Sequence, residues 1–303
     1  MAGRRKDISN PASTGGIGPL FEARVQATFV GLMLTGGCSP LLRPWPINKI
    51  KLQGKVDGFD TDDLIVFVKD KESSEQRKLL AQIKHSLSIS KKDPTFAEVI
   101  QAAWDDFHGD VFKKDKDAIA LITGPLSQKD FHNTKWLLEQ ARVTEDCDEF
   151  LERLKKAKFS PPYCVEKYDA FKHQISSVNG GRTVSDEDVY DFLSAFHLLG
   201  YDLGGQLGVV QSLLHSHIGQ LSDQLPDLVW SKLVEFVQEW NKSAGTIVLE
   251  KVPKDIVELF RKKITHMPRG VYVEPKDQPT TNLSNYPNHD VLAILNLIGG
   301  WNE

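Results

Sequence analysis

Short hydrophobic runs and amphipathic stretches alternate over the first 130 residues. Phe21, Val25, Phe29 and Met33 recur at helical spacing, which predicts a helix with one buried face. Beyond them the pattern predicts three strands, an amphipathic helix and a fully apolar strand ended by Gly-Pro, at residues 47–53, 61–67, 79–84, 96–107 and 118–123. The predicted order is therefore helix, three strands, helix, strand.

The remainder of the chain has a mostly helical pattern. Pro161 and Pro162 interrupt it, and Ser185 with Asp188 forms a capping box that opens one helix. A buried strand is expected at residues 196–202. Further helices are predicted at residues 129–141, 146–157, 163–176, 203–218, 225–241 and 253–264. The chain is thus an α/β protein in which a mixed core is followed by a mostly helical region.

Acidic and basic residues stand at the ends of two predicted strands. Asp62 and Asp63 open the second strand, and Gln82 and Lys84 close the third. Side chains two apart on a strand share a face, so Gln82 and Lys84 point the same way. An acid that holds a divalent cation beside a lysine suits phosphodiester hydrolysis. A solvated strand face bounded by turn-favouring aspartates is the alternative interpretation of the same residues.

Composition sets outer bounds on the function. The chain has 303 residues, of which 40% are hydrophobic and 26% charged, and no apolar run approaches the length of a membrane span. Its three cysteines lack metal-ligand spacing, which favours a reducing cytoplasm. The net charge is −4, but the first 130 residues carry +2 and the rest −6. Candidate phosphate contacts are Arg4, Arg5, Lys6, Lys91, Lys92, Lys113, Lys114 and Lys116.

Several of these motifs together resemble a known family. The order of elements resembles the restriction-endonuclease-like PD-(D/E)xK core, and the motifs are similar to the double-stranded DNA endonuclease domain of bacterial antiphage defence. That domain occurs in CBASS systems and at the N-terminus of AVAST-class STAND NTPases. The residues that carry the resemblance are Gly15, Gly16, Gly18, Phe21, Glu22, Val25, Gln26, Ala27, Asp62, Asp63, Leu64, Gln82, Ile83, Lys84, Ala103 and Trp104.

The resemblance implies a role for each matching position. Asp63 would be the metal-ligating acid, Gln82 occupies the usual Asp or Glu position, and Lys84 would be the catalytic lysine. Glu22 would be an additional acid near the metal, and the carbonyl of Ile83 a further ligand. The implied cofactor is Mg²⁺, with Mn²⁺ as a substitute. Gln82 departs from the family pattern, because a neutral amide binds a hard cation less strongly than a carboxylate does.

Two alternatives remain open on the sequence alone. Asp62 could replace Asp63 as the ligand, since alternation places only one of them on the side of Gln82 and Lys84. The chain could also be a decayed nuclease fold that serves as a DNA-binding or adaptor module, with Gln82 as the mark of that decay.

The resemblance also predicts partners and domains. It implies double-stranded DNA as substrate, no membrane, activation by homo-oligomerisation, and a STAND NTPase or another sensor domain in a longer protein. The expected division is a nuclease-like core at residues 1–145, a helical region at 146–267 that packs on or extends this core, and a linker with a terminal helix at 268–303. No Walker A motif occurs in the chain, so it cannot hydrolyse ATP by that route.

Overall fold

The computed structural model describes residues 16–156, 158, 160–179, 183–204 and 208–260. All of them belong to one compact unit, Met1–Lys262, while the second unit, Lys263–Glu303, lies outside the described residues. The helices are α1 Ile17–Leu34, α2 Pro94–His108, α3 Gln128–Val143, α4 Cys147–Lys155, α5 Cys164–Val178, α6 Asp186–Ala195, α7 Val209–Leu221, α8 Pro226–Asn241 and α9 Lys254–Glu258, with 3₁₀ turns η2 Gly54–Asp57 and η3 Leu249–Lys251. The strands are β1 Ile47–Leu52, β2 Leu64–Lys69, β3 Gln76–Lys84, β4 Ala118–Thr123, β5 Phe196–Gly200 and β6 Thr246–Ile247.

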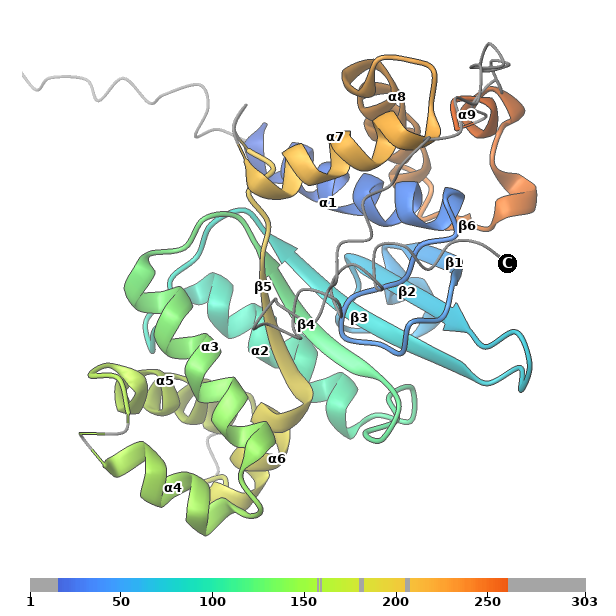
Figure 1. Cartoon of the computed structure of the whole chain (residues 1–303). Helices are drawn as coiled ribbons and strands as arrows, with labels where there is room; N and C mark the ends of the chain where they lie inside the picture. The colour runs from blue at the N-terminus through green and yellow to red at the C-terminus, as the bar shows by residue number, and fades with distance from the viewer. Residues whose placement is uncertain (1–15, 157, 159, 180–182, 205–207, 261–303) are drawn as a thin grey trace, which may run out of the picture. The chain divides into compact units, whose positions relative to one another are not determined.

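One mixed sheet organises the described residues, with strand order β5-β4-β3-β2-β1-β6 (Figure 1). Strands β1, β2 and β3 form an antiparallel meander, and α2 is the crossover that makes β4 parallel to β3. Strand β5 then adds in parallel beside β4, and β6 pairs antiparallel with β1. The predicted order of helix, three strands, helix, strand is confirmed, as is the mostly helical region after it.

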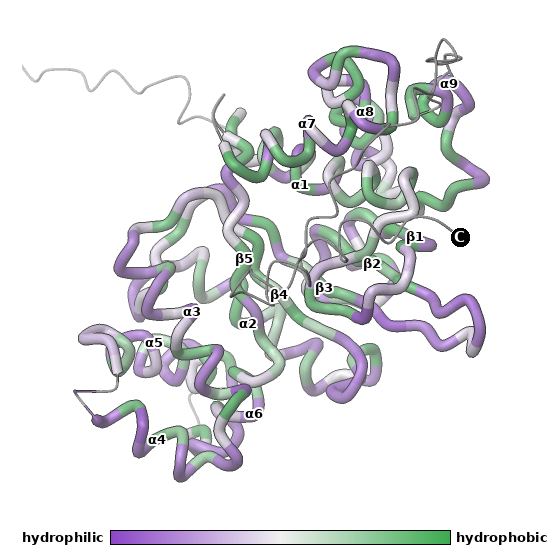
Figure 2. The backbone as a smooth tube through the Cα atoms, viewed as in Figure 1, coloured by the Kyte–Doolittle hydropathy of each residue, from purple (hydrophilic) through white to green (hydrophobic). Residues whose placement is uncertain are grey.

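Helices cover both faces of the sheet (Figure 1). Helices α1, α7 and α8 pack with the residues of β3 at Leu79, Ala81 and Ile83, whereas α2, α3, α5 and α6 pack on the face that includes Leu80. Every residue of β4 is buried, as expected for a strand between two parallel neighbours, and Figure 2 shows the hydrophobic character of β4 and β5. The sheet therefore lies between two hydrophobic cores, one on each of its faces.

Strand register brings the polar strand ends together. Leu64 of β2 lies opposite Ala81 of β3, so the preceding residue, Asp63, falls beside Gln82. Lys84 ends β3 next to Thr123, the last residue of β4. The acid and the lysine that the sequence places on separate strands thus meet at one edge of the sheet.

The second half follows the predicted pattern, but several elements differ at their ends and the short strand β6 was not predicted. Strand β5 and the capping of α6 by Ser185, whose side chain accepts the N–H of Asp188, are confirmed. The helix expected from residue 203 begins instead at Val209, because the Asp202 carboxylate accepts the backbone N–H groups of Val209 and Val210 and fixes the start there. Of the helix predicted at residues 253–264, the structure gives α9 at Lys254–Glu258, and residues 261–264 lie outside the described residues.

Some predictions concern segments outside the described residues. They are the basic arm at residues 4–6 and the linker with a terminal helix at 268–303. Within the residues that the structure does describe, no helix is both long and apolar enough to span a bilayer.

Candidate active site

Asp63 is the centre of the polar cluster at the ends of β2 and β3. Its Oδ2 atom accepts hydrogen bonds from the Gln82 side chain at 2.7 Å and from the Ile83 backbone N–H at 2.7 Å. The Lys84 ammonium lies 3.4 Å from the same oxygen. Asp63 is only 7% exposed, so a carboxylate, an amide and a lysine converge in a largely dehydrated place. Of the two candidate acids, Asp63 is the one that contacts Gln82 and Lys84.

The surroundings of Asp63 raise its pKa to about 6. Burial is the largest cause, because it penalises the charged carboxylate, and the nearby negative charges of Glu22 and Asp62 add to it. Lys84 and the Ile83 N–H act in the opposite direction. Burial also raises the pKa of Asp62. Two acids with raised pKa values beside a lysine are typical of a functional site more than of a structural ion pair.

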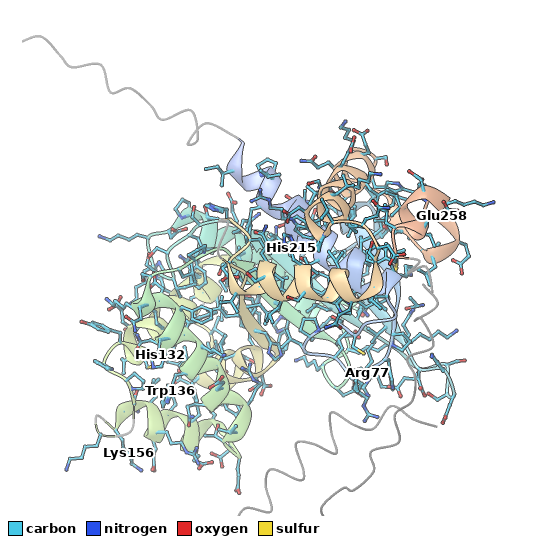
Figure 3. All side chains as sticks on the ribbon, turned by 45° about the horizontal axis from the view of Figure 1, so that its top comes forward. Arg77, His132, Trp136, Lys156, His215 and Glu258 are labelled. Carbon is cyan, nitrogen blue, oxygen red and sulfur yellow. The ribbon has the colours of Figure 1, made fainter. Side chains whose placement is uncertain are left out.

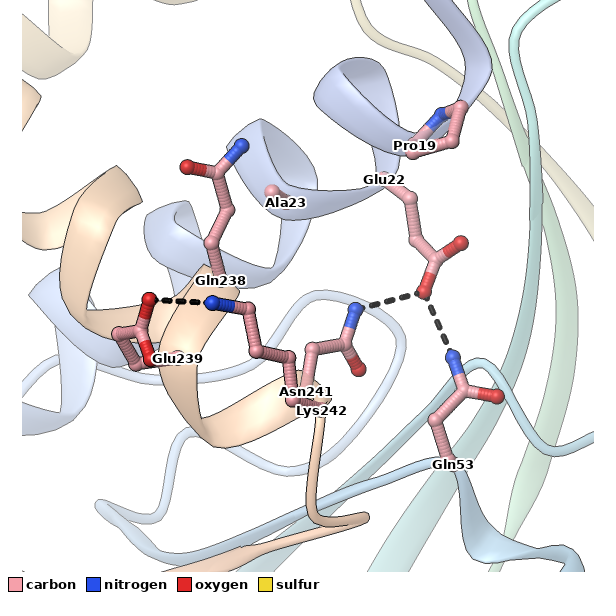
Figure 4. A pocket seen from close by; sticks show the side chains of 8 residues that line it. All are labelled: Pro19, Glu22, Ala23, Gln53, Gln238, Glu239, Asn241 and Lys242. Carbon is pink, nitrogen blue, oxygen red and sulfur yellow. Dashed lines mark hydrogen bonds and ion pairs between the residues drawn. The ribbon is translucent and has the colours of Figure 1, made fainter. Parts of the chain in front are cut away.

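Glu22 reaches this region from the first turns of α1 and lines a cleft of about 550 Å³ (Figure 4). Its Oε1 atom accepts N–H groups from three neutral amides, those of Gln26 at 3.0 Å, Gln53 at 2.8 Å and Asn241 at 3.0 Å. Asn241 stands at the end of α8, so a residue of the helical half helps to hold this acid. Neutral amides orient the carboxylate without neutralising its charge.

Gln26 joins the two acids, and sequence reasoning assigned it no role. Its side chain is fully buried, and Nε2 donates both to Glu22 and, at 2.8 Å, to the backbone carbonyl of Asp63. The position of Gln26 one helical turn after Glu22 was the available sign of an interaction. Its second partner could not be found by spacing, because it lies on another element.

Asp106 of α2 holds the loop that carries Asp62 and Asp63. Its carboxylate accepts the backbone N–H of Asp60 at 3.0 Å and that of Thr61 at 2.6 Å. Asp106 is 1% exposed, and burial raises its pKa. A carboxylate among the buried apolar positions of an amphipathic helix was the sequence sign that this residue has a specific partner.

The donor atoms fit a hard cation in type. Asp63, Glu22, the Gln82 amide and the Ile83 carbonyl offer oxygen ligands, which Mg²⁺ and Mn²⁺ prefer. Gln82 Oε1 is buried and has no hydrogen-bond partner among the described residues, so this acceptor suits a cation or a donor from outside the chain. The charged ligands are few, since the described part of the chain contains no group of three or more His, Cys, Asp or Glu residues placed so that together they could hold a metal ion.

Three histidines and several of the candidate phosphate contacts have partners of their own. The His85 ring packs edge-on against Phe21 at 5.3 Å between centroids. His215, labelled on α7 in Figure 3, has Nδ1 3.0 Å from Asp227, and His217 lies 3.0 Å from the Thr35 hydroxyl. Among the basic candidates, Lys91 pairs with Asp169, Lys116 with Glu75, and Lys114 lies over the ring of Phe107.

Comparison with known proteins gives only a distant likeness. No family model and no curated protein matches the chain. Among solved structures, the Cap4 SAVED/CARF-domain containing receptor of Acinetobacter baumannii, solved with the cyclic trinucleotide 3'3'3'-cAAA, aligns at a TM-score of 0.44 and 10% identity, covering 78% of this chain and 45% of that one. The Cap4 SAVED/CARF-domain containing receptor of Moraxella osloensis aligns at 0.39 and 12%, covering 75% and 44%. The chain thus spans less than half the length of these structures. Likeness at these values says nothing about the activity of this chain.

Proposed function

We propose that this chain is a metal-dependent endonuclease that hydrolyses phosphodiester bonds of double-stranded DNA. The observation that carries the proposal is that the side chains of Gln82 and Lys84 both contact Oδ2 of Asp63. Glu22 is connected to Asp63 through hydrogen bonds of Gln26. These four residues come from α1, from the residue before β2 and from the end of β3, and Asp63 and Lys84 match the nuclease motif, whereas Gln82 stands at the position of its usual Asp or Glu. Residues that act in the same reaction have to lie close together.

The contacts suggest a different chemical role for the acids and for the lysine. Asp63, Glu22, the Gln82 amide oxygen and the Ile83 carbonyl would hold Mg²⁺. When bound, the cation would polarise the phosphate and lower the pKa of a ligated water. Asp63 becomes an anionic ligand above its pKa of about 6. Lys84 stands with its side chain 27% exposed at the rim, where its positive charge can offset the charge that develops on the scissile phosphate.

The biological setting of this proposal rests on the motif resemblance. It makes DNA the substrate, antiphage defence the context, and homo-oligomerisation the event that activates cleavage. A sensor domain such as a STAND NTPase would lie in a longer protein. The −4 net charge fits a chain that engages DNA tightly only when several copies act together.

Plasmid cleavage tests the proposal directly. Wild type, Lys84→Ala and Asp63→Ala are compared with Mg²⁺ or Mn²⁺ at low and high protein concentration. We expect cleavage by wild type that rises steeply with concentration, and a loss of about 100-fold or more in each variant, since each removes charge that acts on the reacting phosphate. Equal cleavage by Lys84→Ala and wild type would rule out the catalytic role assigned to Lys84.

A decayed nuclease that binds DNA is the second candidate, and one observation favours it. In the structure the Gln82 amide donates to Asp63 and occupies the carboxylate oxygen that a cation would otherwise take. Such a protein would bind DNA but would bind Mn²⁺ no better than Asp63→Ala does. Calorimetric titration of both proteins with Mn²⁺ separates the two functions.

A further inference from the structure

The Gln26 side chain connects the two acids of the candidate site, Glu22 and Asp63, through direct hydrogen bonds. It is fully buried in α1, and its Nε2 group donates to Glu22 Oε1 at 3.0 Å and to the Asp63 carbonyl at 2.8 Å. An amide nitrogen carries two hydrogens, so both donors are used. The Glu22 carboxylate and the Asp63 backbone therefore cannot move apart without breaking one of these bonds.

The two restrained groups lie on different elements. Glu22 is in α1, whereas Asp63 precedes β2, and helix packing alone leaves long side chains free to rotate. Mg²⁺ requires ligand distances close to about 2.0–2.1 Å, so a carboxylate that swings by about an ångström no longer serves it. A fixed bridge between the two acids meets this requirement.

We propose that Gln26 is a positioning residue of the cation site, which sets the Glu22 carboxylate relative to Asp63 so that one cation can contact both. This inference rests on the proposed function. Gln26 itself touches neither cation nor substrate and acts through the two acids. Its own Oε1 is buried and has no partner within the described residues, so Gln26 is bound to the site through its N–H groups.

The chain offers a matched control in Gln174. This glutamine of α5 is 4% exposed, and its Nε2 group likewise donates two hydrogen bonds, in this case to the backbone carbonyls of Ser90 and Lys91, both at 3.2 Å. Gln26→Met and Gln174→Met each delete a buried amide and keep the side-chain length. They should cost comparable stability, but only the first touches the acids.

The test is the dissociation constant for Mn²⁺, measured by calorimetry at pH 8 on the full chain well below the melting temperature. We expect Gln26→Met to bind Mn²⁺ about 10- to 100-fold more weakly than wild type, as found for residues that orient metal ligands, and Gln174→Met to bind as wild type does. A purely structural role would lower the melting temperature of both variants and leave both dissociation constants unchanged.

Each other outcome has a definite meaning. Wild-type affinity in folded Gln26→Met overturns the positioning role and leaves the nuclease proposal standing. Absence of Mn²⁺ binding in wild type overturns the proposed function and this inference with it. Should Gln26→Met not fold, Gln26→Asn gives the same decision, because its amide is one methylene too short to span both acceptors.

Discussion

At the scale of single residues, Asp63 shows a conflict between stability and chemistry. A buried carboxylate with few compensating charges is costly when ionised, and the raised pKa of Asp63 expresses that cost. Functional sites often keep such groups because their chemistry requires them. The cost can be measured by removing the charge.

Asp63→Asn should stabilise the metal-free protein at neutral pH. In the native state the pKa rises from 3.8 to about 6, so between these values the native state binds more protons than the unfolded state. Stability therefore falls as pH rises through this window, and the loss persists above it. Replacing Asp63 by asparagine should therefore raise the free energy of unfolding by about 1–3 kcal/mol at pH 7.5, since a shift of one pKa unit corresponds to about 1.4 kcal/mol.

Calorimetric melting in EDTA from pH 4 to 8 checks this prediction. The wild-type curve should decline between pH 4 and 6 relative to that of Asp63→Asn, and the two should converge at the acid end. Asp105→Asn, which changes an exposed acid, is the control and should follow wild type. A melting temperature of Asp63→Asn below that of wild type at pH 7.5 would contradict the argument.

At the scale of elements, α2 supports the site from a distance. Asp106 receives two backbone N–H groups of the loop before β2, and this loop delivers both Asp62 and Asp63. The end of β3 delivers Gln82 and Lys84. The relative position of the acids and the lysine thus depends on how firmly α2 anchors that loop.

Asp106→Ala should loosen this loop. It leaves the N–H groups of Asp60 and Thr61 without an acceptor, which costs about 1–3 kcal/mol of stability. Hydrogen exchange should show faster exchange at residues 60 and 61, together with weaker Mn²⁺ binding. Asp93, the N-cap residue of the same helix, has a carboxylate that also accepts two backbone N–H groups, those of Phe96 and of Ser88 in the preceding loop. Asp93→Ala is therefore the control, and equal exchange at 60 and 61 in both variants would refute a specific anchor.

The elements themselves were largely predictable, because their patterns are local. The run Ala118–Thr123 is apolar throughout and is a buried strand, and Ser185 caps α6 as expected. The predicted start of α7 was wrong, because the helix begins where the Asp202 side chain accepts backbone N–H groups. Strand β6 was not predicted, because two residues are too few to show a pattern. Local patterns determine where elements lie, whereas contacts between them determine their ends.

The candidate site was likewise predictable only in part. Alternation along a strand predicts that Gln82 and Lys84 share a face, whereas the choice between Asp62 and Asp63 needed the register of β2 against β3. The residues that orient them could not be predicted. Asn241 bonds to Glu22 across 219 positions of sequence. No spacing rule connects residues so far apart, because the contact exists only once α8 has packed against α1.

At the scale of the whole molecule, the helical half completes the sheet that carries the site. Strand β5 pairs with β4, and β6 pairs with β1, so residues beyond 145 supply strands on both sides of the meander. Helix α8 packs into the same hydrophobic core as α1, and its last residue holds Glu22. The predicted boundary near residue 145 therefore separates segments that share a sheet and two cores.

A fragment of residues 1–145 should consequently fail to fold cooperatively. Without β5, the apolar β4 becomes a sheet edge, and without α5 and α6 the core around Phe171 and Phe192 is lost. A fragment of residues 1–262 retains every described element and should melt in one transition. Circular dichroism during heating and limited proteolysis of both fragments compare them. A cooperative transition in fragment 1–145 would mean that the helical half only covers a core that is already stable, and that Asn241 is dispensable for the arrangement of the site.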